Sequence, residues 1–288
     1  MNQKLTNWGL FIVLAFIWGS SFILMKEGLK ALSAYEVAAI RMLSAGVVLL
    51  PFALKGFRMV KGRLLFITIL SGFLGSFIPA ILFCLAETRI DSAVAGMLNA
   101  LTPLFVILVG IVFFRSKVQW KKIAGVGIGF SGMLILVFAK GVKIESTDLI
   151  FPGLVLLATF FYGINANMIH HYLKDVGSLQ IASIAFVSLI LPSLGLLGWT
   201  GFFSHHLSEK QFLLSGLASS VLGIFGTAVA SILFYMLMKR SGVLFSSMVT
   251  YGIPFVAVLW GLIAGESISI VELLGLLIIL SGVYITNK

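Results

Sequence analysis

Charged residues are scarce in this chain of 288 residues, and no long polar stretch separates its apolar runs. Charged side chains make up 10% of the sequence and hydrophobic side chains 60%, whereas a soluble domain carries about a quarter charged residues. A soluble core could not hide this much apolar surface, so most of it is expected to face lipid. The composition therefore excludes a soluble enzyme and a soluble binding domain.

Cysteine is nearly absent too, and so are the motifs of several functional classes. The single cysteine, Cys84, excludes a disulfide framework. The chain has no H-E-x-x-H, G-x-S-x-G or Walker A motif, which argues against an intramembrane enzyme and an ATP-driven pump. It also has no T-V-G-Y-G filter, which argues against a potassium-type channel. The pairs His170–His171 and His205–His206 are adjacent, so their rings diverge on a helix, and we expect no metal site and no cofactor.

Long apolar runs are what the sequence has instead. A transmembrane helix needs about 20 mostly apolar residues to cross the hydrocarbon core of a bilayer. Apolar runs between charged residues predict ten spans, at residues 8–25, 35–54, 64–85, 92–114, 123–138, 149–169, 179–203, 212–238, 243–264 and 270–286. The sequence thus predicts an all-α membrane protein with ten transmembrane helices and short connections.

The net charge of +10 is distributed unevenly among these connections. With the N-terminus inside, Lys and Arg concentrate in the segments predicted to be cytoplasmic, and most Asp and Glu fall on the opposite side. This is the positive-inside bias of membrane proteins, in which basic segments face anionic lipid headgroups. We therefore expect a multi-pass protein with both termini in the cytoplasm. Its basic residues are expected to face the lipid bilayer, and no nucleic-acid partner is expected.

An internal repeat divides the chain. Residues 72–103 and 223–254 align without a gap at a constant offset of 151 residues. Residue types that rarely match by chance in apolar helices are paired in this alignment: Gly72 with Gly223, Gly75 with Gly226, Arg89 with Arg240, and Pro103 with Pro254. Two repeats of five spans each are therefore predicted, at residues 1–140 and 148–288.

An odd number of spans in each repeat has a topological consequence. The second repeat must enter the membrane from the side opposite to the first, so the two repeats are inverted. Inverted repeats are typical of secondary transporters, whose halves open alternately to each side of a site near the midplane.

The first span carries Trp18-Gly19-Ser20-Ser21-Phe22 and then Lys26, the second carries Arg41, and the fourth contains Leu101-Thr102-Pro103-Leu104. These motifs resemble those of the drug/metabolite transporter superfamily, and within it the EamA-like family. Pro254 in the ninth span, followed by Gly265-Glu266 and Gly275, is similar to the second-half pattern of that family. The resemblance covers residues 8–286 and implies export of amino acids, related metabolites or drugs without ATP.

One position departs from the family pattern. Where the family usually has a Glu after the fourth span, this chain has Arg115, and the second half alone keeps the acid, as Glu266. A role that needs both acids is therefore not expected here.

Two prolines fall mid-span at equivalent repeat positions, Pro103 and Pro254. A proline removes a backbone donor and frees the carbonyl four residues back, here those of Asn99 and Thr250. Discontinuous helices with free carbonyls at matched positions indicate the binding site of a transporter. We predict that the prolines are hinges and that Asn99, Thr250 and the neighbouring Tyr251 bind substrate. The alternative is that each proline only kinks its helix for packing.

Polar and aromatic residues of the first spans of the two halves complete the predicted binding site. Trp18 and Tyr162 lie mid-span, where a ring can stack on a substrate or fill the core. Ser21 and Asn165 lie three residues further along in each case and are assigned to the same site. No catalytic residue is predicted.

Arg41 is a basic residue within a predicted span, where a charge costs at least about 2.5 kcal/mol. We predict that it binds a substrate carboxylate. The alternatives are bracing of an outer gate against Glu36 or Glu87, and snorkelling of the side chain to the headgroups.

Acidic residues and glycines leave further alternatives open. Glu87 and Asp91 lie in a predicted outer loop, where solvation is expected and gating or proton coupling is the alternative. Glu266 and Glu272 bracket the last predicted outer loop, and solvation is expected there too. Small-residue spacing in the fifth and tenth spans favours close helix packing, either within the chain or in a homodimer; the glycines are Gly125, Gly129, Gly132, Gly275 and Gly282.

Together these features predict a secondary transporter that exports small organic metabolites, such as amino acids or related amphiphilic compounds, across the bacterial inner membrane by alternating access. A flippase for a lipid or lipid-linked headgroup on the same fold is the alternative. An intramembrane enzyme is the alternative from another class.

Overall fold

The computed structural model describes residues 3–114, 120–139, 149–204 and 209–287, and every regular element in these ranges is helical. The first half contains α1 (Gln3–Gly28), α2 (Ala34–Met59), α3 (Gly62–Gly72), η1 (Phe73–Phe77), α4 (Ile78–Ala86), α5 (Ser92–Asn99), α6 (Thr102–Phe114) and α7 (Trp120–Ala139). The second half contains α8 (Ile150–Tyr172), α9 (Ser178–Ser188), α10 (Ile190–Trp199), η3 (Phe202–Ser204), α11 (Lys210–Val221), η4 (Leu222–Val229), α12 (Ala230–Ser247), α13 (Val249–Ile263) and α14 (Ile270–Asn287). The all-α fold is confirmed.

Seven helical segments of the described chain are long and apolar enough to cross a membrane: Lys4–Gly28, Ala34–Met59, Gly62–Ala86, Ser92–Phe114, Ile150–Tyr172, Ser178–Trp199 and Lys210–Ser247. Three shorter apolar helices are Gly127–Ala139, Val249–Ile263 and Ile270–Ile285. The multi-pass membrane protein is confirmed, whereas the count of ten spans stays a prediction. Within α12, Gly242 has φ 84° and ψ 166°, which interrupts the helix just before residue 243, where the sequence predicts a new span.

The start of α2 shows how backbone amides next to a short connection find hydrogen-bond partners. Ser33 caps the helix, because its hydroxyl accepts from the backbone amide of Glu36 at 3.3 Å. The Glu36 carboxylate accepts in return from the Ser33 amide at 2.8 Å and from its hydroxyl at 2.9 Å. This reciprocal capping box satisfies donors that the first turn of a helix leaves free.

Two π-helical segments occupy equivalent positions of the sequence repeat. Segment η1 connects α3 to α4, and η4 connects α11 to α12. A π turn interrupts the regular hydrogen-bond pattern of an α-helix and frequently occurs at functional sites. The two halves therefore share a local irregularity as well as a sequence pattern.

Paired glycines of the repeat sit where the two halves touch. A Cβ atom on Gly72 would lie 2.9 Å from the carbonyl oxygen of Ala185 on α9, so α3 approaches the backbone of the second half. A Cβ atom on Gly223 would collide with the carbonyl oxygen of Arg41 on α2, so η4 approaches the backbone of the first half. Glycine is needed at both positions because no side chain fits between the backbones. The contacts are reciprocal, and the halves interlock.

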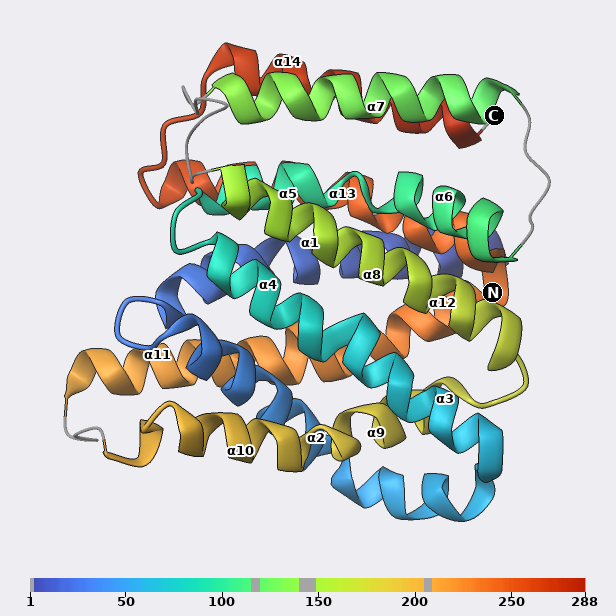
Figure 1. Cartoon of the computed structure of the whole chain (residues 1–288), viewed down its shortest axis with the longest axis vertical. Helices are drawn as coiled ribbons and strands as arrows, with labels where there is room; N and C mark the ends of the chain where they lie inside the picture. Colours follow the sequence, from blue (N-terminus) through green and yellow to red (C-terminus); the bar gives the residue numbers. More distant parts are fainter. Residues whose placement is uncertain (1–2, 115–119, 140–148, 205–208, 288) are drawn as a thin grey trace.

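Helices α7 and α14 pack side by side at one edge of the bundle (Figure 1). A Cβ atom on Gly132 would lie 2.7 Å from the carbonyl oxygen of Gly275, and one on Gly282 would collide with the backbone amide of Gly129. Small residues let two helices approach closely in this way. These glycines thus pack within the chain, which is one of the two alternatives that the sequence leaves open, and the homodimer stays a prediction.

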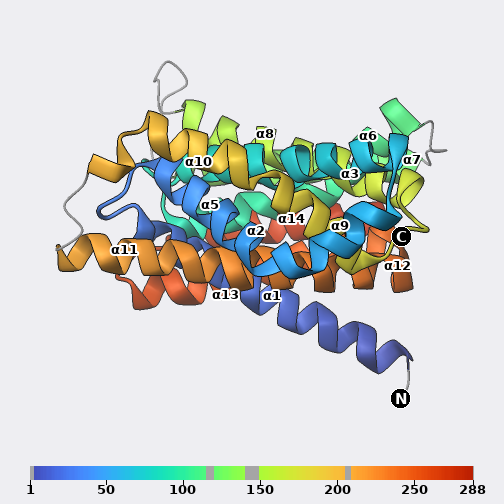
Figure 2. The same ribbon diagram turned by 90° about the horizontal axis from the view of Figure 1, so that it is seen from below.

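The start of α1 and the end of α14 lie at the same end of the bundle, here named the terminus end (Figures 1 and 2). The connections at residues 29–33, 87–91 and 264–269 lie at the opposite end, here named the clasp end (Figure 1). These two ends frame the cavity described next.

Candidate functional site

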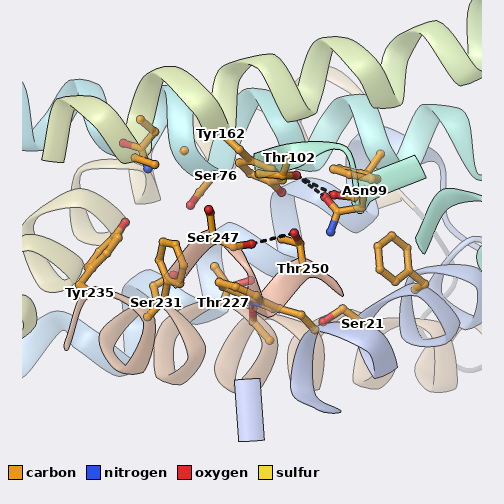
Figure 3. A pocket seen from close by; sticks show the side chains of 18 of the residues that line it. Ser21, Ser76, Asn99, Thr102, Tyr162, Thr227, Ser231, Tyr235, Ser247 and Thr250 are labelled. Atoms are coloured by element: carbon orange, nitrogen blue, oxygen red, sulfur yellow. Dashed lines mark hydrogen bonds between the residues drawn. The ribbon is translucent and has the colours of Figure 1, made fainter. Parts of the chain in front are cut away.

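A cavity lies between helices of the two halves (Figure 3). About 890 Å³ of space in and at the mouth of this cavity is occupied by no atom, open solvent included. Seven of the eight predicted binding residues line it: Trp18, Ser21, Arg41, Asn99, Tyr162, Asn165 and Thr250. The eighth, Tyr251, lies outside the lining.

Arg41 is the one charged side chain among the described residues that line the cavity. It is 8% exposed, which rules out snorkelling to the headgroups. Its Nε donates to Oγ1 of Thr227 on η4 at 2.7 Å, and its Nη1 lies 3.8 Å from Sδ of Met25 on α1. A guanidinium has more N–H donors than these two contacts use, so Arg41 can also bind a ligand in the cavity.

Aromatic side chains form walls on two sides of the cavity. On one side, Trp18 donates from Nε1 to the carbonyl oxygen of Gly226 in η4 at 3.0 Å, and its ring packs 5.1 Å from that of Phe234. On the other, Tyr162 stacks on Phe83 with ring centroids 6.0 Å apart and an interplanar angle of 23°. Aromatic walls of this kind can hold a planar, apolar or cationic part of a solute.

The second pair of repeat glycines brings polar groups to the cavity. A Cβ atom on Gly226 would lie 2.7 Å from Oγ of Ser21, and one on Gly75 would collide with the side-chain amide of Asn165. Oδ1 of Asn165 is buried without a hydrogen-bond partner. Because buried polar atoms are nearly always paired, this oxygen is available as an acceptor for a donor on a ligand.

A helix break before Pro103 places polar groups on the cavity wall. Helix α5 ends at Asn99, and α6 begins at Thr102. The Thr102 hydroxyl lies 2.8 Å from the Asn99 carbonyl oxygen, to which it donates, and 3.1 Å from Oδ1 of the same residue (Figure 3). The prediction of a free carbonyl at Asn99 is therefore wrong, because Thr102 supplies a donor that the proline lacks.

The second proline has a different setting. Pro254 lies inside α13, and Thr250 donates from Oγ1 to the carbonyl oxygen of Ser247 at 2.8 Å (Figure 3). Pro103 and Pro254 lie outside the cavity lining, so their hinge role stays a prediction.

Several lining residues were missed, although the repeat contains a signal for them. Phe83 and Phe234 are equivalent in the two halves and both line the cavity, as do Ser76 and Thr227 in the two π segments. Residues at matched positions of the sequence repeat thus approach the same central space. Tyr235 also lines the cavity and has no such sequence signal.

A cluster of polar contacts joins α1, α5 and the connection between α13 and α14 at the clasp end; we name Lys26, Ser92, Ala93 and Glu266 the clasp. Lys26 Nζ, at the end of α1, lies 2.5 Å from Oε1 of Glu266. The Glu266 carboxylate also accepts from the Ser92 amide and the Ala93 amide, each at 3.1 Å, and from the Ser92 hydroxyl at 2.7 Å. An anion at these first amides of α5 is favourable for the helix dipole.

The electrostatics of the clasp follow from these contacts. Burial opposes ionisation of Glu266, whose side chain is 4% exposed. The hydrogen bonds from Lys26, Ser92 and Ala93 outweigh burial, so the pKa of Glu266 lies below its ordinary value. Because its partner Arg115 in the repeat lies outside the described residues, no equivalent cluster is described at the terminus end.

Solvation of the loop acids is contradicted at three positions. Glu87 is 5% exposed, Glu272 is 1% exposed, and the Glu266 side chain is 4% exposed. Glu87 and Glu266 are buried where connections pack together, which the local sequence does not reveal. Glu272 lies instead in the first turn of α14, where its carboxylate accepts from the Ser269 amide at 2.7 Å. Of the two histidine pairs, His205–His206 lies outside the described residues.

Comparison with known proteins gives consistent matches. A model of the EamA-like transporter family matches the chain twice, at residues 7–138 and 151–288. An uncharacterized transporter of Archaeoglobus fulgidus is 23% identical over 98% of this chain and 99% of its own length. The uncharacterized inner membrane transporter YedA of Escherichia coli K12 is 25% identical over 99% of this chain and 92% of its own.

A relative with a named solute and a solved structure add to these matches. The S-adenosylmethionine/S-adenosylhomocysteine transporter of Chlamydia muridarum is 28% identical over 62% of this chain and 58% of its own length. One crystal structure superposes with a TM-score of 0.69 at 16% identity, covering 98% of this chain and 96% of that one, which supports the fold.

Proposed function

The chain belongs to the EamA-like transporter family, and from this premise we propose that it is a secondary transporter that exports small organic metabolites by alternating access. The observation that carries the proposal is the cavity between the two halves, which has polar and aromatic walls and the buried cation Arg41. Secondary transporters bind their substrates in sites of this kind, between two related halves.

In the proposed architecture, ten spans form two inverted repeats at residues 1–140 and 148–288. The double match of the family model, the paired π segments and the reciprocal glycine contacts support this arrangement. Pro103 and Pro254 would then let the fourth and ninth spans bend, because the missing backbone bond no longer resists bending.

The proposed substrates are zwitterionic or neutral and partly apolar. Arg41 would bind a carboxylate, Oδ1 of Asn165 would accept from an ammonium or amide group, and the aromatic walls would hold the remainder. S-adenosylhomocysteine, one of the two solutes in the name of the chlamydial relative, is a zwitterion that combines a carboxylate, an ammonium group and an aromatic base. It therefore joins amino acids in the panel to be tested.

The proposed location is the bacterial inner membrane, with both termini in the cytoplasm and the clasp end facing outward. The positive-inside bias of the connections supports this orientation. The match to a relative named as an inner membrane transporter supports the location.

The test is counterflow in proteoliposomes that contain the purified full chain. Vesicles loaded with one unlabelled solute of the panel should take up the same labelled solute transiently, in a saturable manner, and empty liposomes should not. A fluorescent phospholipid is measured in parallel, because a flippase would translocate it. Translocation of lipid without counterflow of any amino acid or S-adenosyl compound would contradict the proposal.

A further inference from the structure

Glu87 lies in the connection between α4 and α5, at the clasp end. Its backbone amide donates at 2.9 Å to the carbonyl oxygen of Phe83, which lines the cavity one helical turn earlier. The residue is 5% exposed, and neither of its carboxylate oxygens has a hydrogen-bond partner among the described residues. A carboxyl group with both oxygens buried and unpaired is exceptional, because buried polar atoms are nearly always satisfied.

Lys26, the lysine that acts electrostatically on Glu87, is bound to other acids. Lys26 influences Glu87 electrostatically, but its Nζ forms the clasp with Glu266 and lies 3.7 Å from Oδ1 of Asp91. Glu266 itself is a second acid that faces Glu87 from the connection before α14. The clasp therefore satisfies Glu266 and leaves Glu87 beside it without a cation of its own.

The arginines near Glu87 are also directed elsewhere. Arg41 faces it from α2, yet its Nε donates to Thr227 on η4. Arg89, two residues further along, holds its guanidinium carbon 5.9 Å from the centroid of the Phe151 ring. A negative charge on Glu87 would thus be buried with no hydrogen bond, which proteins avoid by keeping such a group neutral.

The remaining titratable groups do not change this conclusion. Cys84 on α4 and Tyr162 on α8 belong to the same electrostatic network and are ordinarily uncharged at neutral pH. Glu36 on α2 accepts from Ser33 at the start of its own helix. Burial raises the pKa of Glu87 well above its ordinary value, and Glu266 adds to this effect, while Lys26 and Arg41 oppose it.

We propose that Glu87 is a proton-binding site and that the clasp end closes only when Glu87 carries a proton. The proton comes from the aqueous medium on the clasp side and forms the O–H bond of the neutral acid. When the clasp end opens, the carboxyl group becomes hydrated and returns its proton to that medium. The consequence for transport rests on the proposed function, whereas the binding of the proton does not.

The sign of the pH dependence follows from linkage. The closed conformation holds the proton more tightly than the open one, so a fall in pH favours closure and a rise favours opening. The ratio of closed to open conformation changes with pH between the ordinary pKa of a glutamate and the raised pKa of Glu87. Because the pKa of Glu266 is lowered, its carboxylate stays ionised through this range. Each unit of pKa difference corresponds to a change of up to about tenfold in the ratio of the two conformations.

The experiment measures accessibility of the cavity from the clasp side as a function of pH. The full chain carries Cys84→Ala and the reporter Ser21→Cys, a nearly isosteric change on the cavity wall. An impermeant thiol reagent is applied from the clasp side in membranes. Labelling of the otherwise wild-type protein should rise with pH more steeply than in Glu87→Gln, which mimics the protonated acid and should stay closed. Glu87→Asp should keep the pH dependence.

Two further measurements separate the outcomes. Glu27→Gln is the matched control, because Glu27 pairs with Lys30 on the surface, 2.6 Å away, and should keep the wild-type pH profile. Infrared spectra should contain the carbonyl band of a buried protonated carboxyl group, and that band should disappear in Glu87→Gln. An unchanged pH profile in Glu87→Gln, or an unchanged carboxyl band, would overturn the proposal. Neither measurement needs a substrate, so failure to find a transported solute would refute the proposed function and not this site.

Discussion

Replacing Arg41 tests the assignment of the partner that binds the substrate's carboxylate. The guanidinium is buried, and its Nε is held 2.7 Å from Oγ1 of Thr227, so the orientation of its remaining N–H groups is set before a ligand arrives. Hydrogen bonds to charged groups contribute about 1.5–3 kcal/mol each. Loss of the two hydrogen bonds from the guanidinium to a substrate carboxylate should therefore cost about 3 kcal/mol, which lowers the affinity for the substrate roughly 150-fold.

Three variants separate charge from geometry at this position. Arg41→Met removes the charge and keeps most of the volume, so it should show the full loss of affinity. Arg41→Lys keeps a charge but lacks the planar fork and the Nε that binds Thr227, so an intermediate loss of roughly tenfold is expected. Thr227→Val leaves the guanidinium in place and removes only its orienting partner, which should cost about 1 kcal/mol, or roughly fivefold.

The assay is the half-saturating concentration for counterflow of a zwitterionic substrate and of its amide, in which the carboxylate is neutral. Arg41→Met should weaken transport of the zwitterion much more than transport of the amide. Equal effects of Arg41→Met on the two compounds, or wild-type half-saturation for the zwitterion, would refute the assignment and leave Arg41 as a packing residue.

Two other substitutions test the clasp and the cavity wall. Glu266→Gln removes the charge that binds Lys26 and should favour opening of the clasp end by about 1–2 kcal/mol. This value is discounted for solvent screening, because the Lys26 side chain is 34% exposed. Labelling of the cavity from the clasp side should rise several-fold, whereas Glu27→Gln should leave it unchanged. Gly75→Ala places a Cβ atom against the side-chain amide of Asn165, so it should lower stability by about 1–3 kcal/mol and slow transport. Gly153→Ala, with open space around it, should not lower stability. Equal melting temperatures of the two variants would contradict the close contact.

The fold could be predicted in its main features because lipid imposes simple rules on sequence. Apolar runs of the right length are helices, and the offset between Gly72 and Gly223 predicted related halves before any contact was known. The structure explains that match, because each glycine lies against a backbone of the opposite half. Close approach of two backbones can be recognised in the sequence, since only glycine fits at such a position.

The candidate site could be predicted in part for a related reason. Polar side chains such as Arg41 and Asn99 are expensive within a span, so their presence there indicates a cavity or a partner. Contacts that depend on tertiary packing could not be predicted from the sequence. Glu87 occupies a loop by sequence, and its burial depends on how three connections meet at the clasp end. The satisfied carbonyl of Asn99 depends likewise on the rotamer of Thr102.

The central claim is that one cavity opens alternately to the two sides of the membrane. Labelling of the Ser21→Cys reporter from each side, in the Cys84→Ala background and with Glu266→Gln added, tests it most directly. The account predicts that the reporter is reached from both sides in separate reactions, and that Glu266→Gln raises labelling from the clasp side while lowering it from the terminus side. Labelling that rises from both sides together would indicate a continuous pore and would contradict alternating access.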